Sequence, residues 1–541
     1  MTGTVRPATS AVWSPRPALL IAVYLALYVT ACIPIFAVET LPLSDLPNHL
    51  ARAYILDHLD TDPLLQKYYL AHWQLFSFQS TDIILPWLTH VLGVSFGQQL
   101  FVAVTFALLL GGTIAIHFVL FRKVGLWPAA VVLFLYNFPL TGGQVSFMFS
   151  TGLGLLLFAA WLASAGTSSF LRVPFFIVAS FGLMLCHFFA FSAYALLVMS
   201  FALGKAWRAA GTRQKLRILI EAGLPFVVPG ICFLMSFGNA VTGGSEWGSI
   251  FRKFIVLISP VINYGRWPDV VLALGVIVAL WWLNRRKAIK LAPEMRFSAL
   301  VLLLAALAMP NLLQGIHAAD MRLPSFLAFL FVASNELRLG SRRGWLVFVT
   351  AVFVLLGVRV GSTLAEWTRI DADYREFRAA DAKLERGSRL AVIPIGDDFR
   401  ADPAPALPYW YIACLAVIDR QVFMPLLYTI ATPLDLTAEG KALDGDALAR
   451  GRTVPEWHPA DPAFAGVDPE TLRQVQWTAQ RMSDDDAFTS RIDWSDWPED
   501  YDYVVDFHLG RPGNPVPALL TELARGSYFT IYRIHPPLHA E

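Results

Sequence analysis

The chain has 541 residues, of which 56% are hydrophobic and only 15% are charged, and its mean hydropathy is +0.53. Because an average soluble domain carries about 25% charged residues, this composition excludes an ordinary water-soluble protein and predicts a polytopic membrane protein. The four cysteines are too few and too scattered for a disulfide framework or a metal-binding pair.

The net charge of +1 averages two unlike parts of the chain. From residue 366 to the end there are 29 acidic and 17 basic residues, a net charge of −12. This leaves 12 acidic and 25 basic residues, a net charge of +13, before that point among the 41 acidic and 42 basic residues of the whole chain. The break predicts a basic membrane domain over 1–364 and an acidic soluble domain over 365–541. The acidic charge of the second domain argues against nucleic-acid binding.

Apolar segments suited to crossing a bilayer, which takes roughly 17–25 residues, recur along the first domain. Eleven are predicted, at 17–37, 98–120, 126–141, 145–164, 170–186, 188–206, 217–237, 268–284, 296–310, 321–336 and 344–362. The first follows Arg6 and Arg16, and no clear small-x-small cleavage site comes after it. It is therefore predicted to be a retained signal-anchor helix.

Basic residues concentrate in alternate connecting segments, which are 121–123, 205–217, 285–287 and 338–343. With eleven spans these four segments share one side, and a surplus of Lys and Arg marks the cytoplasmic side. The outward-facing parts are then the loops 38–97, 138–144, 238–267 and 311–320, together with the C-terminal domain.

The first outer loop, 38–97, is long and not of disordered composition. Its segment 45–59 is predicted to be a helix, with Ser44 or Asp45 as the cap and Pro47 in the first turn, where a missing N–H costs nothing. The segment 68–92 is aromatic and apolar, which predicts a helix lying in the membrane interface.

The C-terminal domain alternates helices and strands, which favours a small α/β sheet. Helices are predicted at 365–385, 405–418 and 517–525, and strands at 389–395, 422–424, 503–509 and 528–534. The stretch 430–500 is rich in Asp, Pro and Trp and is predicted to be mostly irregular. The predicted fold is therefore a helical membrane bundle with an extracytoplasmic α/β domain.

Polar residues cluster at the start of the 45–59 helix. Asp45, His49 and Arg52 stand at i, i+4 and i+7, so they project from one face. One interpretation makes Asp45 a helix cap, with His49 at the lipid headgroups and Arg52 snorkelling. The other makes Asp45 a general base or a metal ligand with His49 assisting, because polar groups at a bilayer boundary are functional candidates by default.

Short motifs carry a resemblance to a known superfamily. The segment 44–50 reads SDLPNHL, 319–324 reads ADMRLP at the start of a late span, and 501–505 reads YDYVV before the last strand, 528–534. These motifs and the layout of the chain resemble poorly characterised bacterial members of the GT-C superfamily of integral membrane glycosyltransferases. The resemblance implies transfer of a sugar from a polyprenyl-phosphate donor, on the outer side of a bacterial inner membrane, to a glycan, lipid or protein acceptor.

The same resemblance implies roles for individual residues. An acceptor hydroxyl must lose its proton as it attacks the anomeric carbon, which needs a base, and Asp45 takes that role beside His49. Asn48 and Arg52 are then substrate-binding residues, and Glu246, followed by Trp247, closes over the substrate from an outer loop.

The leaving lipid phosphate would need a cation or a metal. The basic candidates are Arg322, Arg252, Lys253, Arg266 and His317. The competing interpretation of Arg322 is an interfacial snorkel beside Asp320. The competing interpretation of Arg252, Lys253 and Arg266 is a solvated face of the loop 238–267. His187, between two spans, either lines a cavity or only marks a helix break.

One departure from the superfamily concerns a second acidic residue, which many members carry in the next outer loop. Here 137–146 holds Asn137 and Gln144 but no carboxylate. A divalent ion, Mg²⁺ or Mn²⁺, with Asp45 as a ligand is therefore left open. The alternative function is a non-catalytic scaffold or a transporter of lipid-linked glycans.

Overall fold

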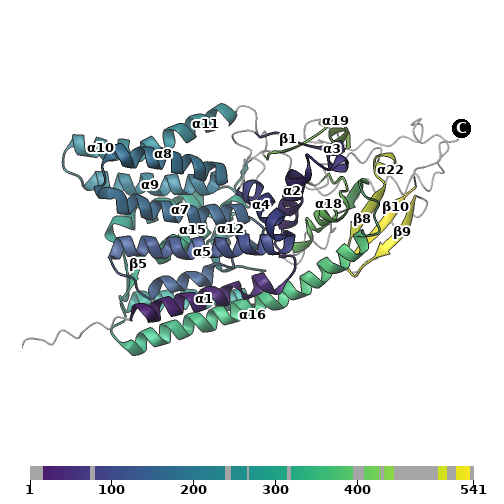
Figure 1. Ribbon diagram of the computed structural model, residues 1–541. Coiled ribbons are helices and arrows are strands. Elements are labelled where there is room, and N and C mark those ends of the chain that lie inside the picture. The colour runs from purple at the N-terminus through teal and green to yellow at the C-terminus, as the bar shows by residue number, and fades with distance from the viewer. Residues whose placement is uncertain are drawn as a thin grey trace, which may run out of the picture.

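The computed structural model describes residues 16–73, 80–237, 245–264, 267–313, 318–393, 407–425, 427, 432–443, 497–508 and 519–535. A bundle of long helices forms one part of the molecule, and a smaller mixed domain lies beyond one end of it (Figure 1). The chain is thus a helical membrane protein with a C-terminal sheet domain, as the composition predicts.

The bundle consists of apolar helices. They are α1 (Pro17–Ala37), α5 (Val94–Phe121), η1 (Trp127–Phe134), α6 (Phe138–Thr141), α7 (Val145–Ala163), α8 (Ser169–Cys186), α9 (Phe188–Arg208), α10 (Thr212–Gly223), α11 (Val227–Phe237), α13 (Trp267–Arg285), α14 (Arg296–Ala308), α15 (Arg322–Ser334) and α16 (Arg342–Asp381). All eleven predicted spans fall on these helices. By length and composition, eight stretches of the described chain could cross a membrane, and the segments 126–141, 296–310 and 321–336 form shorter helices.

Small residues let α5 and α7 pack closely at the centre of the bundle. A Cβ atom at Gly112 of α5 would lie 2.7 Å from the Cβ of Leu155, and one at Gly152 of α7 would lie 2.6 Å from the Cβ of Leu108. Lipid tails are as apolar as Leu, so membrane helices associate through this kind of close backbone approach. The pair forms a rigid centre on which the loops at both ends are built.

The two ends of the bundle differ. Figure 1 places α10 and β5 (Asn335–Leu337) at one end, and α2 (Leu46–His58) and α4 (Ser80–Leu92) at the other. The four basic segments, between α5 and η1, α9 and α10, α13 and β3 (Ile289–Leu291), and β5 and α16, all lie at the β5 end. Lys123 and Arg338, from two of these segments, both pair with Glu336 of β5. The basic segments therefore share one end, and its cytoplasmic orientation stays a prediction.

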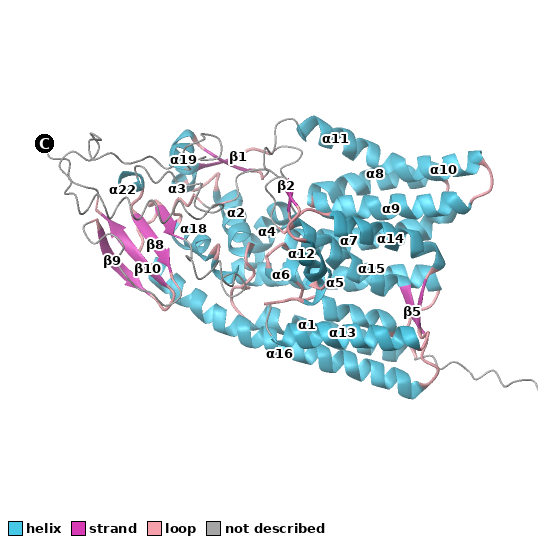
Figure 2. Cartoon of the chain, turned by 180° about the vertical axis from the view of Figure 1, so that it is seen from behind, coloured by secondary structure: helices cyan, strands magenta, loops and turns pink. Residues whose placement is uncertain are grey.

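Helix α16 connects the bundle to the soluble domain without a break. Its 40 residues span about 60 Å at 1.5 Å per residue, twice the thickness of a bilayer core. Its second half continues beneath the sheet, as both ribbon views show (Figures 1 and 2). The predicted span 344–362 and the predicted helix 365–385 are therefore one element.

The soluble domain holds a four-stranded sheet with the order β6-β8-β10-β9. Strands β6 (Leu390–Ile393) and β8 (Tyr503–Phe507) are parallel, and β10 (Phe529–Ile534) is antiparallel to both β8 and β9 (Leu520–Arg525). The predicted strands 389–395, 503–509 and 528–534 are confirmed over these described residues.

The predicted helix over 517–525 is wrong, because its described part, 520–525, is strand β9. Leu520 and Ala524 are buried while Thr521 and Glu522 are exposed, and the pairing register shifts at Leu523, opposite Ile531 and Tyr532 of the partner strand. Leu, Glu, Ala and Arg favour helices in isolation, but pairing along the edge of β10 overrides that propensity.

The other predicted elements of this domain are shorter than expected. The helix predicted over 405–418 consists of η7 (Leu407–Tyr409), η8 (Ile412–Cys414) and α18 (Leu415–Arg420) over its described residues. The predicted strand at 422–424 is a single parallel bridge between Arg389 and Phe423. Within 430–500 the described elements are β7 (Leu434–Leu436), α19 (Ala438–Leu443) and α22 (Trp497–Asp500).

The first outer loop is folded into the soluble domain. The helix predicted over 45–59 is α2, while the helix predicted over 68–92 is only partly correct: α3 (Pro63–Tyr68) leads into β1 (Tyr69–Ala71), and helix α4 begins at Ser80. Strand β1 is extended because it pairs antiparallel with β7 of the C-terminal domain. Ile55 and Tyr68 of the loop share one core with Tyr374 of α16 and Val505 of β8.

Candidate functional site

The sequence-predicted polar cluster lies where the bundle end, the first outer loop and the soluble domain meet. Helix α2 packs against α4 on one side and against η8 and α18 on the other. Gln421, at the end of α18, donates a hydrogen bond of 3.0 Å to the hydroxyl of Tyr54 in α2. Burial raises the pKa of the Cys414 thiol in η8. The positive charge of Arg52 lowers this pKa and the negative charge of Asp45 raises it, so both residues lie near the thiol. The soluble domain therefore covers the start of α2.

Asp45 sits at the N-cap position of α2, but its side chain makes no capping hydrogen bond. It is partly exposed, whereas the neighbouring Ser44 and Asn48 are buried. The interpretation of Asp45 as a simple helix cap therefore does not describe its position. Its predicted role as a base stays a prediction.

A glycine turn from the second outer loop holds Asp45 in place. The N–H of Ser44 donates to the carbonyl of Thr141 at 3.0 Å, which brings the turn against the first loop. Gly143 has φ +76°, and a Cβ atom there would come within 2.2 Å of the backbone nitrogen of Asp45. Only glycine tolerates both this backbone conformation and this approach. The segment without a carboxylate therefore packs directly against the backbone of Asp45.

Arg52 is buried completely and pairs with Asp82 of α4, whose side chain is also buried. The Nε of Arg52 donates to Oδ1 of Asp82 at 3.1 Å, and a second guanidinium nitrogen also contacts that oxygen. Arg52 thus anchors α2 to α4 and does not snorkel towards a surface. A direct contact of Arg52 with substrate stays a prediction.

His49 lies in the interior between the two helices. Its Nδ1 is 3.4 Å from the hydroxyl of Thr81, and only 5% of the residue is exposed. Burial lowers the pKa of His49 well below its usual range, and the positive charge of Arg52 acts in the same direction. His49 is therefore a neutral imidazole at physiological pH, able to orient a hydroxyl but not to supply positive charge.

His187 lies at the break between α8 and α9, near His49 and near Arg322. Its ring packs edge-on against Phe147 at 5.6 Å, and its Nδ1 is buried with no hydrogen bond within the described part of the chain. Next to it, Ser146 hydrogen-bonds the carbonyl of Cys186 at 3.1 Å and meets the hydroxyl of Ser80 at 2.9 Å. The break thus brings the bundle into contact with the start of α4.

Arg322 begins α15 on the other side of the glycine turn. Its Nε donates to Oε1 of Gln144 at 3.0 Å, and its guanidinium lies 4.5 Å from the ring centre of Phe189. Gln144 follows Gly143 directly, so one turn contacts both Asp45 and Arg322. One turn therefore packs against the backbone of Asp45 and hydrogen-bonds Arg322, two residues that stand 277 positions apart in the chain.

A cavity of about 90 Å³ lies beside Arg322. Its wall is apolar, with Phe147 of α7, Phe189 and Leu196 of α9 and Met309 after α14. Among the described residues that line it, Arg322 is the one ionisable side chain. An apolar slot with a guanidinium at its rim suits a ligand that joins a hydrocarbon to an anion.

Arg252 and Lys253 of α12 (Ile250–Leu257) are held by Asp320, which is completely buried. Arg252 makes two hydrogen bonds of 3.1 Å to the carboxylate, and Lys253 lies 3.5 Å from it and contacts the carbonyl of Met309. Two cations around one anion leave a local surplus of positive charge two residues before Arg322. The predicted solvated loop face therefore does not describe these two residues.

Three further predicted site residues lie apart from this geometry. Glu246 is exposed in β2 (Ser245–Glu246), which pairs with β4 (Leu312–Leu313). Arg266 and His317 lie outside the described residues. Their predicted roles stay predictions.

The described residues do not form a metal-binding group: no cluster of three or more His, Cys, Asp or Glu side chains occurs among them. Divalent Mg²⁺ and Mn²⁺ prefer several oxygen ligands. Asn137, in the loop where a second carboxylate is expected, instead caps α6 by accepting from the N–H of Leu140 at 3.0 Å. The described residues alone therefore do not fit a divalent ion, and the predicted metal stays a prediction.

Sequence reasoning missed Asp82, Gly143 and the contact of Gln144 with Arg322. The pair of glycines at 142–143 is the one signal that marks the turn. Asp82 carries no local signal, because its importance comes from the packing of α4 on α2.

No protein-family model matches the chain, and no curated protein sequence matches it. Among solved structures the chain is similar to ArnT from Cupriavidus metallidurans bound to undecaprenyl phosphate, with 12% identity, 97% of this chain and 99% of that chain covered, and a TM-score of 0.44. The apo state of the same protein gives 14% identity, 97% and 98% coverage, and a TM-score of 0.44. ArnT is a GT-C glycosyltransferase, the superfamily that the sequence motifs resemble. Identity and TM-score are both low, so function has to be argued from the residues of this chain.

Proposed function

We propose that this chain is a membrane glycosyltransferase that transfers a sugar from a polyprenyl-phosphate donor to an acceptor on the outer side of the membrane. The observation that carries the proposal is the glycine turn, which contacts Asp45 through Gly143 and Arg322 through Gln144. A group that can accept a proton and a group that can stabilise a phosphate are thus fixed relative to one another. The motif at 44–50, with its resemblance to GT-C enzymes, supports the same activity.

Asp45 acts as the general base in this proposal. The acceptor hydroxyl gives its proton to the carboxylate while its oxygen forms a bond to the anomeric carbon, and the bond from that carbon to the phosphate oxygen breaks. General base catalysis of this kind contributes about 100- to 10,000-fold. The neutral His49, buried four residues further along α2, orients the hydroxyl.

Arg322 acts on the leaving group. A sugar linked through one phosphate leaves behind a lipid phosphate with one more negative charge than the donor carried. A cation at that oxygen is worth more in the transition state than in the ground state, and this difference accelerates the step. Arg252 and Lys253, around Asp320, add positive potential from the same side.

The cavity beside Arg322 accepts the first part of the isoprenoid chain. Its aromatic and aliphatic wall lies between α7, α9 and α15, and the rest of the chain would run along the apolar outer surface of these helices. The soluble domain covers α2 and would confine the acceptor near Asp45. The outward direction follows from the predicted orientation and rests on it.

The test is sugar transfer in vesicles that contain a defined polyprenyl-phosphate sugar. Asp45→Asn should lower the transfer rate by about 100-fold or more, and Arg322→Gln by about 100-fold, with both proteins as stable as the wild type. Asp57→Asn is the matched control, because Asp57 lies on the same helix and pairs with His90 away from the turn. Near wild-type transfer by Asp45→Asn would refute the assignment of the base.

A metal requirement is tested in the same assay. The proposal derives no step through a divalent ion, so a chelator should leave transfer unchanged. If transfer stops with the chelator and returns with Mg²⁺ or Mn²⁺, Asp45 is a metal ligand and the base has to be sought elsewhere.

A non-catalytic scaffold is the second candidate function. It is favoured by the loop 137–146, in which polar residues have structural roles. In this loop Asn137 caps a helix and Gln144 holds Arg322, so neither residue supplies an acid. A scaffold would bind the polyprenyl phosphate without transferring sugar. Binding that depends on Arg322 but not on Asp45, together with no detectable transfer, would identify it.

A further inference from the structure

The end of the bundle opposite the candidate site carries a second concentration of charge. The residues 205–221, from the end of α9 to the end of α10, include five basic side chains and one acidic side chain, a net charge of +4. The basic residues are Lys205, Arg208, Arg213, Lys215 and Arg217. Nothing in the proposed glycosyl transfer uses them.

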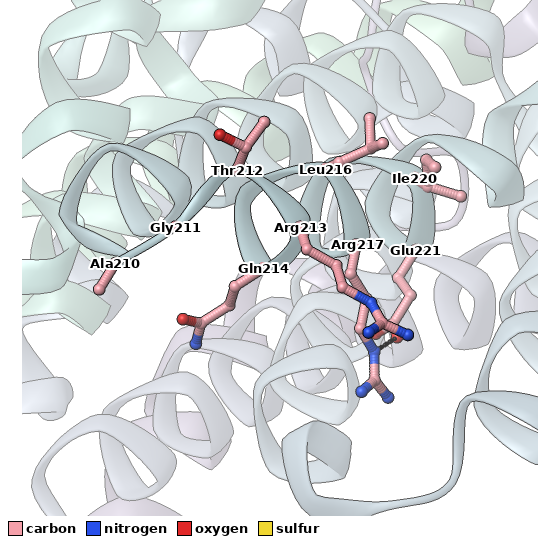
Figure 3. Close-up of a pocket in the computed structure, with 9 residues that line it drawn as sticks. All are labelled: Ala210, Gly211, Thr212, Arg213, Gln214, Leu216, Arg217, Ile220 and Glu221. Atoms are coloured by element: carbon pink, nitrogen blue, oxygen red, sulfur yellow. Dashed lines mark hydrogen bonds and ion pairs between the residues drawn. The ribbon is translucent and has the colours of Figure 1, made fainter.

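An open concavity of about 840 Å³ lies along this segment (Figure 3). It is lined by Ala210, Gly211, Thr212, Arg213, Gln214, Leu216, Arg217, Ile220 and Glu221. Arg213, Gln214 and Arg217 form a polar side of α10, and Leu216 and Ile220 form an apolar stripe next to it (Figure 3). The exposed fractions of Leu216 and Ile220 are 57% and 49%. The helix is therefore amphipathic, with its polar and apolar sides both open to the surroundings.

The one acidic residue of the segment is engaged by the protein itself. Glu221 accepts a hydrogen bond from Arg217 at 2.7 Å and another from Ser169 of α8 at 2.7 Å, and it lies 3.7 Å from Arg172. Arg172 in turn stacks on Trp161 of α7, 3.6 Å from its ring centre. The contacts of Glu221 with Ser169 and Arg172 fix α10 on the bundle. Because these contacts occupy the carboxylate of Glu221, it does not neutralise the other cations of the segment.

Arg213 and Lys215 keep their charges exposed. Both side chains are solvent-accessible, and neither makes an ion pair or a side-chain hydrogen bond within the described part of the chain. Among the described residues, Arg208 donates one hydrogen bond, to the carbonyl of Gly204 at 3.0 Å. The local surplus of positive charge is thus available to an external anion.

Exposed aromatic residues surround the charged segment. Trp207 is 87% exposed and Phe170, at the start of α8, is 83% exposed. Aromatic side chains at the ends of spans sit at the level of the lipid headgroups. The span candidate that begins at Thr212 and runs to Met235 starts at the same point. The concavity therefore lies at headgroup depth, and the occupant that meets it there is a lipid.

We propose that this concavity, with Arg213 in its lining and the exposed Lys215 as a second cation on the same helix, binds the phosphate of an anionic phospholipid headgroup. The guanidinium of Arg213 holds the phosphate and the ammonium of Lys215 adds positive potential nearby, while Leu216 and Ile220 contact the upper part of the acyl chains. Basic residues near an anionic membrane surface each contribute about 1 kcal/mol of attraction. The site anchors the end of the bundle opposite the glycosyl-transfer site and does not depend on the proposed reaction.

The test measures lipid bound to the full-length protein purified in a neutral detergent. Phosphatidylglycerol, phosphatidylcholine and inorganic phosphate are titrated separately, and bound lipid is read by native mass spectrometry. The wild type should bind phosphatidylglycerol with saturation and phosphatidylcholine much more weakly. Arg213→Gln combined with Lys215→Gln should lower the affinity for phosphatidylglycerol roughly 30-fold, from two contributions of about 1 kcal/mol each.

The matched control is Arg285→Gln combined with Arg286→Gln, which removes the same charge at the same end of the bundle. These two guanidinium groups lie over Trp281 and Trp282, 5.2 and 4.8 Å from the ring centres. An affinity that stays within about threefold of the wild type supports a local site. An equal loss in both double variants would overturn the proposal in favour of general charge attraction.

Two further results would also overturn the proposal. Equal binding of phosphatidylcholine would show that the phosphate charge is not recognised. Displacement of phosphatidylglycerol by millimolar inorganic phosphate would identify a site for a soluble anion. Both substituted residues are exposed, so the variants should fold, and an unchanged thermal midpoint in detergent confirms that before the titration.

Discussion

The two ends of the helix bundle use charged residues in opposite ways. At the end covered by the soluble domain, Arg52, Asp82 and Asp320 are buried and paired. At the other end, Arg213 and Arg217 are exposed on an open helix surface. The same types of side chain therefore fix geometry at one end and face the surroundings at the other.

This contrast between the two ends predicts where substitutions should change the stability of the protein most. A charge that is buried with its partner has lost its water, so removing the partner leaves it without compensation. A charge on an open surface stays hydrated and loses little when its partner is removed. The covered end should therefore respond strongly to single substitutions, and the basic end should respond weakly.

The largest effect is expected for Arg52→Met. The substitution leaves the carboxylate of Asp82 buried without its guanidinium, which typically costs 3–5 kcal/mol. The measurement is the free energy of unfolding of the purified protein in detergent. The double variant Arg52→Met with Asp82→Leu should recover a large part of the loss, because two apolar groups of similar size replace the buried pair. If the double variant is as unstable as the single one, packing rather than charge explains the loss.

Gly143→Ala should have the next largest effect. The positive φ alone costs about 1–2 kcal/mol for a residue with a side chain, and the added Cβ would also displace the backbone of Asp45. Sugar transfer should therefore fall by more than the loss of stability explains. The measurements are transfer in vesicles and thermal unfolding of the same preparation.

Gly93→Ala separates the two causes. Gly93 has φ +78°, almost the same as Gly143, but a Cβ atom there would meet nothing within 4 Å. It should reproduce the part of the loss of stability that comes from the positive φ, and it should leave transfer unchanged. Equal loss of transfer in both variants would show that the contact between Gly143 and Asp45 has no role in the reaction.

The elements set by local pattern were predictable from the sequence. Apolar runs of span length gave all eleven helical segments, and the proline-containing start of 45–59 gave α2. The β-branched and aromatic residues of 503–507 and 529–534 gave strands β8 and β10. In each of these elements local propensity and burial agree.

The elements set by distant partners were not predictable. Strand β9 has the residues of a helix, and it is extended only because β10 offers an edge. Strand β1 is extended because β7, more than 360 residues further along the chain, pairs with it. Hydrogen bonds between segments so far apart leave no periodic signal in either of them.

The candidate site divides in the same way. Asp45, His49 and Arg52 could be found because they share one face of a single helix. The pairing of Arg52 with Asp82, and the turn that contacts both Asp45 and Arg322, join four different segments. Residue types in one sequence do not reveal such contacts.

A smaller effect is expected from His49 when the pH is lowered. Because burial lowers the pKa of His49, the unfolded chain binds a proton near pH 6.5, its ordinary value, before the folded protein does. The stability that the neutral imidazole contributes is present above that pH and is lost as the pH falls below it. Thermal midpoints measured from pH 8 to pH 5 should therefore fall on the acid side.

His49→Gln should flatten this dependence, because glutamine does not titrate. His90→Gln is the control, since 68% of the His90 side chain is exposed and it should leave the profile as it is. An acid-side slope that persists unchanged in His49→Gln would assign the effect to another group.

The smallest effect is expected for Arg217→Met at the basic end, the counterpart of Arg52→Met. Arg217 pairs with Glu221 at 2.7 Å in an i, i+4 arrangement, but 73% of its side chain is exposed. Exposed helix pairs of this kind contribute about 0.3–0.5 kcal/mol, and Glu221 keeps its bond to Ser169 when the guanidinium is removed. The free energy of unfolding should therefore change about tenfold less than with Arg52→Met. Since both substitutions replace one arginine by one methionine, a comparable loss at the two ends would mean that the soluble domain does not exclude water from the Arg52–Asp82 pair.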